Sequence, residues 1–376
     1  MTQLENISII NMGQSPDSST YNKNGNGLPF FQGNADFGVK YPEIRMWCSE
    51  PTKVAQEGDI LISVRAPIGA MNIANCECCI GRGLAALTVK KDVCERKYLW
   101  YALSNKVEEL NAKGTGSTFK AINKKILEET EIPLPPLDEQ CKIAAVLDKV
   151  SDLIAKRRQQ LDKLDEMVKA RFVEMFGNPL NEGCRYQKVP LGVVADVGSS
   201  KRIFEKEYVS SGVPFYRTKE IVELSKGHKI TTELFITKER FAEIRDEYGV
   251  PQKGDLLISA VGTIGVIWIV DGKNDFYFKD GNLLRVSVSN NFNPVYLKML
   301  LETLIAAHKQ KMSVGTAYAA LTISMLKDMM VYLVPLDEQN QFAAFVEQIE
   351  KAKTSINRSL EKLETLKKAL MQEYFG

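Results

Sequence analysis

The sequence repeats itself, and corresponding segments lie a little under 200 residues apart. PLDEQ at residues 136–140 returns at 335–339, and Phe-Gly at 176–177 returns at 375–376, both 199 residues later. GDILIS at 58–63 matches GDLLIS at 254–259 with an offset of 196, and GLPFF at 27–31 matches GVPFY at 212–216 with an offset of 185. A period this long is too large for a solenoid unit. We therefore interpret the chain as a duplicated domain with insertions in its second copy.

Each copy has the same internal order, a Gly-rich region of short apolar segments followed by one long charged helix. Apolar bursts that alternate with Gly, Asn and Asp predict half-buried strands and turns. Since proline is tolerated at helix starts, the long helices should begin after Pro136 and Pro335. A further helix is expected inside each region, at 98–110 and 295–308.

These features predict an α+β fold: two similar mixed α/β domains separated by two long coiled-coil helices, with an internal pseudo-two-fold repeat. The expected boundaries are a first domain at 1–135, a first spacer helix at 136–177, a second domain at 178–334 that includes a short linker at 178–188, and a second spacer helix at 335–376.

The two long helices carry apolar residues at alternating spacings of four and three, which is the heptad seam of a coiled coil. The predicted seam residues are Val150, Ile154, Leu161, Leu164 and Val168 in the first helix, and Ile349, Ile356, Leu360, Leu363 and Leu370 in the second. Charges interrupt the seams at non-equivalent places, Arg157 and Arg171 in one and Lys353 and Lys367 in the other, which favours pairing between the two helices. Each would extend about 60 Å. The alternative is an amphipathic helix packed only on its own domain.

The composition indicates an ordinary globular protein and gives no simple sign of its partner. With 49 Lys+Arg against 47 Asp+Glu the formal net charge is +2, so the strongly basic balance that announces a nucleic-acid partner is absent. The longest uncharged run, 256–270, is too short to span a bilayer, which needs roughly 20 helical residues; it favours buried strands joined by a turn. No basic and apolar leader opens the sequence. We expect a cytoplasmic chain with no membrane contact.

The cysteines offer one candidate metal site, which the duplication argues against. An odd number of cysteines and no export signal favour reduced thiols; the seven are Cys48, Cys76, Cys78, Cys79, Cys94, Cys141 and Cys184. Cys76, Cys78 and Cys79 are clustered but lack a second ligand pair at zinc-site spacing. Because no cysteine follows Cys184, the second copy folds without any. We predict no metal.

Motifs that would make this chain an enzyme are missing. The sequence has no phosphate-binding G-x-x-x-x-G-K-[ST] loop, no G-x-S-x-G elbow and no Asn/Asp-Pro-Pro-aromatic loop of a DNA amino-methyltransferase. The paired acids Asp138-Glu139 and Asp337-Glu338 stand at predicted helix starts, where they favour the helix dipole. We predict a non-catalytic chain.

Over essentially its whole length the chain resembles the specificity (S) subunit of type I restriction-modification systems. The resemblance is carried by GQSP at 13–16, GLPFFQG at 27–33, GDIL at 58–61, RAPIG at 65–69, GRG at 81–83 and GSTFKAI at 116–122, and above all by the repeated PLDEQ and Phe-Gly segments. The second copy departs from the pattern, because STFK at 117–120 becomes TAYA at 316–319 and RAP at 65–67 becomes VGT at 261–263.

The resemblance implies two target-recognition domains, each reading one half of a bipartite site in double-stranded DNA. It also implies two antiparallel helices that set the spacing and dock two methyltransferase (M) subunits, with S-adenosylmethionine bound by those subunits and no cofactor in this chain. Restriction (R) subunits, when present, would bring ATP and Mg. The rival interpretations are a coiled-coil DNA-binding regulator or scaffold without a methyltransferase partner, and a DNA enzyme with an unrecognised site.

Base reading needs Arg, Lys, Asn, Gln, Ser or Thr side chains at groove edges, with other basic groups on phosphates. Residue type, loop context and repeat position select the following candidates: Gln14, Lys23, Arg65, Arg82, Lys120, Asn123 and Lys124 in the first domain, and Lys201, Arg202, Arg217, Lys219, Lys279 and Tyr318 in the second. The alternative for each is an ordinary solvated surface residue. With so little net charge, we expect the isolated chain to bind DNA weakly and with shallow salt dependence.

Overall fold

The structure, a computed structural model, describes residues 1–116, 120–181, 183, 185–312 and 320–376. The chain forms two compact units: the first unit contains 1–159 and 357–376, and the second unit contains 160–356. The helices α5 (Leu137–Phe176) and α11 (Leu336–Phe375) each contribute to both units. Both begin directly after the proline of the repeated PLDEQ segment, as the sequence predicts.

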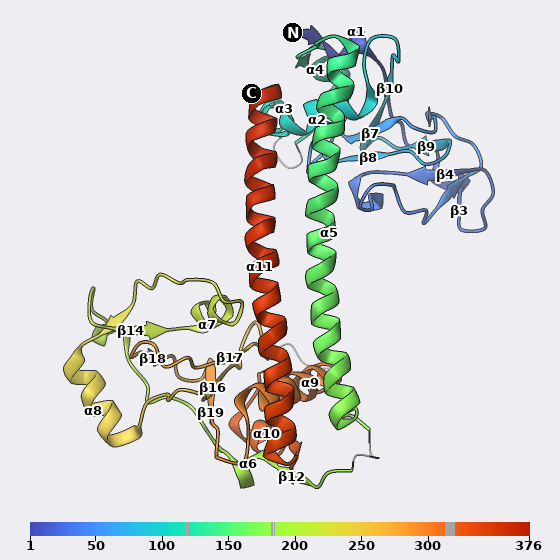
Figure 1. The fold of residues 1–376 in the computed structure, drawn as a ribbon. Coiled ribbons are helices and arrows are strands. Elements are labelled where there is room, and N and C mark those ends of the chain that lie inside the picture. Colours follow the sequence, from blue (N-terminus) through green and yellow to red (C-terminus); the bar gives the residue numbers. More distant parts are fainter. Residues whose placement is uncertain (117–119, 182, 184, 313–319) are drawn as a thin grey trace. The chain divides into compact units, whose positions relative to one another are not determined.

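The first unit is built on a four-stranded antiparallel sheet in the order β2-β10-β7-β8 (Figure 1). Its strands are β2 (Ser8–Met12), β7 (Ile60–Ser63), β8 (Met71–Ile73) and β10 (Leu84–Val89). A second sheet, in which β4 and β9 run parallel, contains β3 (Tyr21–Asn22), β4 (Leu28–Phe31), β5 (Trp47–Cys48), β6 (Val54–Ala55) and β9 (Cys78–Ile80). The other elements are β1 (Thr2–Gln3) paired with β11 (Glu131–Ile132), the 3-10 turns η1 (Ser18–Thr20) and η2 (Asn34–Asp36), and the helices α1 (Leu4–Ile7), α2 (Arg96–Asn105), α3 (Val107–Lys113) and α4 (Lys124–Glu128).

The second unit repeats this plan, with an antiparallel sheet in the order β13-β19-β16-β17. Its strands are β13 (Asp196–Gly198), β16 (Leu256–Ser259), β17 (Ile267–Ile269) and β19 (Leu283–Ser287). The smaller sheet contains β14 (Val213–Tyr216), β15 (Phe235–Ile236) and β18 (Tyr277–Phe278), and β12 (Lys188–Pro190) pairs with β20 (Met330–Tyr332). The helices are α6 (Leu191–Val194), α7 (Thr218–Ser225), α8 (Lys238–Tyr248), α9 (Pro294–Met312) and α10 (Ile323–Lys327), with one 3-10 turn, η3 (Glu205–Glu207).

The matching strand orders confirm the duplication predicted from the sequence. The main insertion in the second copy lies between β14 and β16, where α7 and α8 flank β15; β15 pairs with β14 as β5 pairs with β4 in the first unit. The uncharged run 256–270 forms β16, a turn and β17, as predicted. The helix expected at 98–110 is interrupted at Lys106, which separates α2 from α3, whereas its counterpart α9 is continuous.

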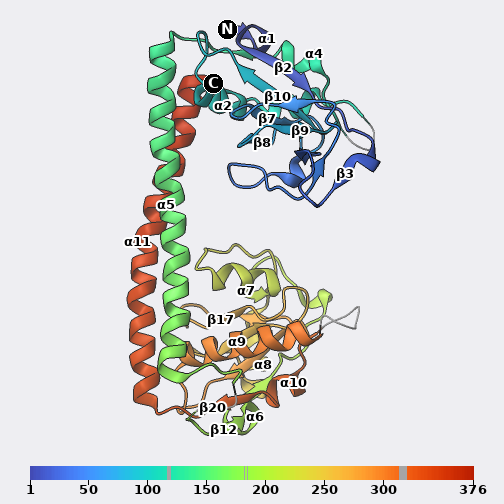
Figure 2. The same cartoon turned by 90° about the vertical axis from the view of Figure 1, so that its right-hand side faces the viewer.

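Each main sheet is covered on both faces, which follows from the period of two along a strand. In β16, Leu256 and Ile258 pack with residues of α9, while Leu257 packs in a separate cluster with Ile221 of α7. Figure 2 shows α7 and α9 beside this sheet. In the first unit, Ile60 and Ile62 of β7 face the helix side and Leu61 faces the smaller sheet. None of the described helices is long and apolar enough to cross a membrane.

In both units the two long helices run antiparallel. In the first unit, Tyr98 donates to the Pro133 carbonyl before α5 begins (2.7 Å) and packs on Phe375 where α11 ends (5.2 Å between ring centres); further along, Arg158 pairs with Glu364 at 2.7 Å. In the second unit it is the end of α5 that meets the start of α11, because Phe176 contacts Phe342 there.

The predicted seam residues lie along the less exposed side of the helices. Val150, Ile154, Val168 and Ile349 are buried. The remaining six, Leu161, Leu164, Ile356, Leu360, Leu363 and Leu370, are half-buried. The charge at Lys353 is satisfied within the second unit, where its ammonium lies 2.5 Å from Asp165 on α5 and 2.8 Å from Glu350.

The helix ends exchange partners between the repeats. Phe375, which closes the second repeat, is buried against Tyr98 of the first domain. Phe176, which closes the first repeat, packs at 4.9 Å on Tyr296 of the second domain. Each domain is thus covered by the beginning of its own long helix and the end of the other one.

The glutamine of PLDEQ is buried in both units and ties each long helix to its domain. The Gln140 side chain accepts from the Glu95 N–H (2.9 Å) and donates to the carbonyls of Pro135 (2.8 Å) and Val93 (3.2 Å). Gln339 repeats this pattern with the Asn293 N–H (2.8 Å) and the carbonyls of Val334 (2.8 Å) and Asn291 (3.0 Å). The preceding acids lie in the first helical turn, as the dipole interpretation predicts.

The seam of the first unit contains a half-buried lysine, Lys367, whose charge is unfavourable there. Its replacement therefore tests the packing of the seam. Burial, together with the Arg158 guanidinium, lowers the pKa of Lys367, because both disfavour the ammonium form, and Asp148 opposes them. The ring centre of Tyr101 lies 5.7 Å from the Lys367 ammonium. We expect Lys367→Met to raise the free energy of unfolding at pH 7 by about 1 kcal/mol, measured in urea. The exposed neighbour supplies the control, Lys368→Met, which should change nothing. A destabilised K367M chain would mean that the contact with Tyr101 outweighs the cost of burial.

Candidate nucleic-acid interface

An exposed arginine of the first unit, Arg82, projects from a tightly fixed loop between β9 and β10. The Gly81 N–H donates to Phe31 O (2.8 Å), the Gly83 N–H donates to Gln32 O (3.1 Å), and the Arg82 N–H donates to the Ser15 hydroxyl (3.2 Å). These bonds attach the loop to two neighbouring segments. The backbone position of Arg82 is therefore fixed while its side chain remains in solvent.

Three more exposed polar side chains come from segments hydrogen-bonded to this loop. The Gln14 N–H donates to Ile80 O (3.1 Å), and the Gln32 carbonyl accepts a hydrogen bond from the Gly83 N–H. Arg65 follows Val64, whose N–H donates to Gly83 O (2.9 Å). We call Gln14, Gln32, Arg65 and Arg82 the first rim. Gln32 was not among the residues predicted from the sequence.

The other predicted contacts of the first domain lie beside this rim or serve local structure. Lys120 is exposed, and its carbonyl accepts from the Ala66 N–H (3.1 Å), which places it next to Arg65. Asn123 caps α4 by accepting from the Ile126 N–H, and Lys124 pairs with Glu128 at 3.0 Å. Lys23 lies in the exposed turn between β3 and β4.

Equivalent backbone bonds locate the corresponding rim in the second unit. The Ala260 N–H donates to Asn282 O (2.8 Å) as Val64 donates to Gly83, and the Lys279 N–H donates to Tyr216 O (2.9 Å) as Gly81 donates to Phe31. With the sequence offsets and the bond of the Gly281 N–H to the Ser199 hydroxyl (3.3 Å), these bonds identify the second rim as Ser199, Arg217, Val261 and Gly281. Arg217 occupies the place of Gln32, and Val261 that of Arg65.

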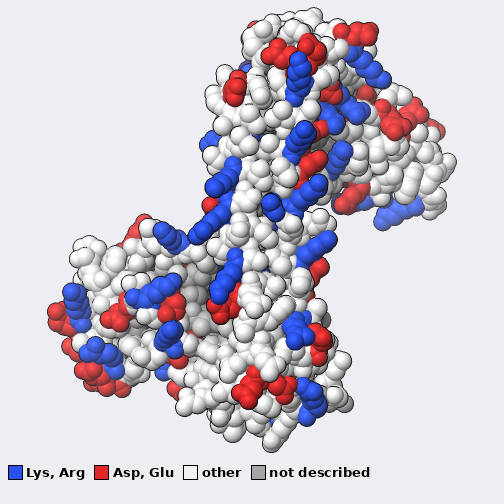
Figure 3. Space-filling view, viewed as in Figure 1, with Lys and Arg blue, Asp and Glu red and all other residues white. Residues whose placement is uncertain are grey.

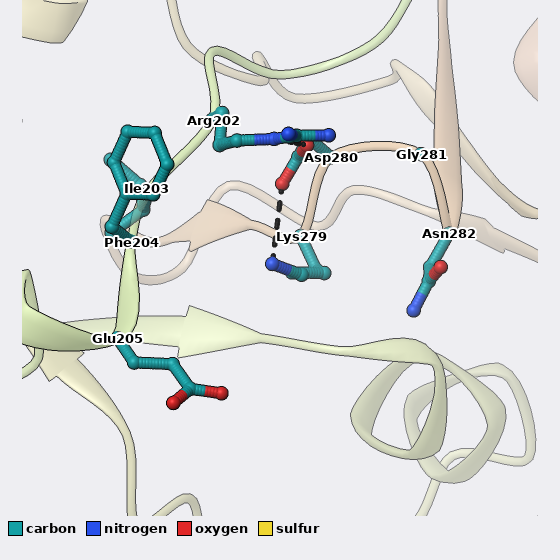
Figure 4. Close-up of a pocket in the computed structure, with 8 residues that line it drawn as sticks. All are labelled: Arg202, Ile203, Phe204, Glu205, Lys279, Asp280, Gly281 and Asn282. Atoms are coloured by element: carbon teal, nitrogen blue, oxygen red, sulfur yellow. Dashed lines mark hydrogen bonds and ion pairs between the residues drawn. The ribbon is translucent and has the colours of Figure 1, made fainter.

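The predicted cations of the second domain are engaged by neighbouring side chains. Arg202 and Lys279 converge on Asp280 (Figure 4), at 2.7 and 3.4 Å. Although desolvation opposes the change, these two cations lower the pKa of Asp280 overall. They line an open pocket of about 400 Å³ together with Phe204 and Asn282.

The remaining predicted residues of this domain are held in a similar way. Arg217 and Lys219 lie 3.3 and 3.7 Å from the buried carboxylate of Glu220. The Lys201 ammonium lies 4.7 Å from the ring centre of Tyr248. Tyr318 lies outside the described residues. On the face shown in Figure 3, acidic side chains lie among the basic ones.

The clustered cysteines of the first unit behave as apolar side chains. Cys78 packs with Phe31 and Ile80 on one face of β9, whereas Cys79 packs with Phe30 and Cys48 on the other. Burial raises the pKa of Cys78 to about 12 and that of Cys79 to about 11. Within the described residues, no group of three or more His, Cys, Asp or Glu side chains could hold a metal ion. Cys184 lies outside those residues.

Comparison with known proteins agrees with the duplicated architecture. The family described as the type I restriction modification DNA specificity domain matches the chain at residues 1–165 and again at 185–367. Two copies of a DNA-specificity domain thus account for nearly the whole sequence. The chain belongs to the family of type I restriction-modification specificity subunits, and its role is DNA sequence specificity.

Individual proteins similar to this chain are also described as type I specificity subunits. The chain is 47% identical over 160 residues to the putative type I restriction enzyme MjaX specificity subunit of Methanocaldococcus jannaschii, a match that covers 43% of this chain and 38% of that protein. It is 26% identical over 369 residues to the putative specificity subunit S.HindORF215P of Haemophilus influenzae, covering 95% and 88%. The fold matches the S subunit from M. genitalium with a TM-score of 0.60 at 16% identity, over 100% of this chain and 95% of that one.

Proposed function

We propose that each unit reads one half of a bipartite target in double-stranded DNA. The observation that supports this most directly is the recurrence of one rim, at equivalent backbone positions, with different side chains in the two units. Equivalent positions suit a common way of approaching DNA. Different side chains suit different half-sites, because base edges are distinguished by their donor and acceptor patterns.

The helices α5 and α11 are proposed to set the distance between the half-sites and to dock two methyltransferase subunits. One support is their antiparallel pairing in both units. Another is a pair of exposed apolar side chains one heptad apart on the part of α5 in the first unit, Val146 and Leu153, which are 39 and 44% exposed. A partner helix would cover such a pair.

Catalysis is proposed to reside in the partners. The methyltransferase subunits would bind S-adenosylmethionine and methylate adenine, and restriction subunits, when present, would bring ATP and Mg. This chain would supply sequence reading alone, in the cytoplasm where the DNA lies. The test is methylation mapping of the host genome with and without the gene: a bipartite methylated motif should be present with it and absent without it.

Shortening both helices tests the spacer. Removal of 157–163 from α5 and 357–363 from α11 deletes one heptad from each and preserves the seam pattern. Seven residues correspond to about 10 Å of helix, or about three base pairs. We expect both half-sites to remain and the gap between them to shrink by about three base pairs in the methylation map. A deletion in α5 alone puts the seams out of register and should abolish methylation. An unchanged gap with the double deletion would disprove the spacer role.

A further inference from the structure

The two rims differ in their charge chemistry. Arg65 and Arg82 of the first rim are exposed, and no described carboxylate lies within 4.0 Å of either guanidinium. At the equivalent places the second rim has Val261 and Gly281, whose N–H donates to the Ser199 hydroxyl (3.3 Å) as that of Arg82 donates to Ser15. The neighbouring Asp280 is paired with Arg202 and Lys279. The one cation of the second rim, Arg217, is drawn toward Glu220. Full hydrogen-bonding capacity at these two positions is therefore available in the first unit only.

The backbone around Arg82 is packed so closely that Gly83, which follows it, and Gly13, which contacts its loop, have no room for a side chain. A Cβ on Gly83 would lie 2.5 Å from Gln32 O, and a Cβ on Gly13 would lie 2.2 Å from Gly81 O. The three segments of the first rim thus approach each other backbone to backbone. This crossing fixes the backbone from which the Arg82 side chain projects, which is the preorganisation that a specific contact requires.

The composition of the first rim suits base edges better than phosphates. A guanidinium matches the two acceptors O6 and N7 of guanine, and the side-chain amide of glutamine matches N6 and N7 of adenine. Gln14 and Gln32 flank Arg82 on its two neighbouring segments. A purely phosphate-binding surface has no need of two uncharged amides, and Lys120, beside the rim, can serve that purpose.

We propose that Arg82, with Arg65 beside it, reads guanine in the half-site of the first unit. This inference rests on the proposed bipartite reading and adds the base class that this rim recognises. It follows that the first half-site contains a G·C pair at the position Arg82 reaches. The second half-site, facing Val261 and Gly281, is read without an arginine at those positions.

The test uses the chain co-expressed with its methyltransferase subunits, and duplexes that carry the motif found by methylation mapping. We expect Arg82→Ala to weaken binding about 10- to 100-fold and to make one G·C pair in one half-site degenerate in the methylation map. Replacing that guanine by 7-deazaguanine, which lacks the N7 acceptor, should weaken wild-type binding and leave the R82A complex unaffected. Arg82→Lys keeps the charge but loses the paired donors, and should recover only part of the affinity.

A matched control is Arg96→Ala. Arg96 is exposed and donates to Gly58 O (3.1 Å), at the opposite end of β7 from Arg65, so the motif should stay intact. If the wild-type complex methylates a bipartite motif that R82A leaves unchanged, or relaxes equally in both halves, guanine reading by Arg82 is wrong and the proposed function stands. If the wild-type complex gives no bipartite motif, the proposed bipartite reading itself is wrong, and with it the role inferred for Arg82.

Discussion

Replacing Gln140 with leucine should lower the free energy of unfolding of the first unit by roughly 3–5 kcal/mol. Leucine has a similar volume but no polar atoms. It would leave the partly buried bonding groups, the Glu95 N–H and the carbonyls of Pro135 and Val93, without their partner. Each orphaned group costs about 1–3 kcal/mol, because it exchanges a hydrogen bond with water for none.

The measurement is urea unfolding followed by hydrogen exchange, which assigns the loss to one unit. Gln339→Leu should cause a loss of similar size in the second unit, because its three bonds are the same. Glu139→Leu is the control: Glu139 is exposed in the first turn of α5 and should have little effect. A Q140L chain as stable as the wild type would show that the three bonds are dispensable.

Gln140 illustrates which features of the fold the sequence repeat can predict and which it cannot. The repeat predicts where both long helices begin, and the structure places them there. It cannot tell which residue of PLDEQ is buried, because Asp, Glu and Gln are all polar and all suit a helix start. The partners of Gln140 come from Val93 and Glu95, more than 40 residues earlier, and only the folded chain brings them together.

The site could be predicted in part. Arg65 and Arg82 follow from residue type between glycines and prolines, and both are exposed in the first rim. Gln32 was missed, although the offset of 185 relates it to Arg217, which was selected. The ion pair between Arg202 and Asp280 joins residues 78 positions apart, so a sequence cannot show that the cation is engaged.

The exchange of helix ends between the repeats was not predicted, although the repeated Phe-Gly was noticed. Heptad spacing indicates that two helices pair, and the non-equivalent charges favour pairing with each other. Neither feature says which domain an aromatic end covers. That depends on contacts such as the Asn105 amide with the Phe375 carbonyl (3.2 Å), which are 270 residues apart.

The exchange makes a strong prediction: Phe375→Ala should destabilise the first unit and Phe176→Ala the second, each by about 3–5 kcal/mol. Phe375 belongs to the second repeat, yet it is buried on Tyr98. Phe176 belongs to the first repeat, yet its ring contacts Tyr296 and Phe342 at 4.9 and 5.6 Å. Truncating either ring leaves a cavity in the domain it covers.

Hydrogen exchange measured by mass spectrometry distinguishes the units, because lost protection should appear in peptides of 84–105 for F375A and of 283–305 for F176A. Leu366→Ala and Val173→Ala remove apolar side chains that are 46 and 48% exposed on the same two helices, and should change little. If each helix end instead stabilised the domain of its own repeat, F375A would loosen the second unit and F176A the first. Only the crossed result is compatible with the burial of Phe375 beside Tyr98.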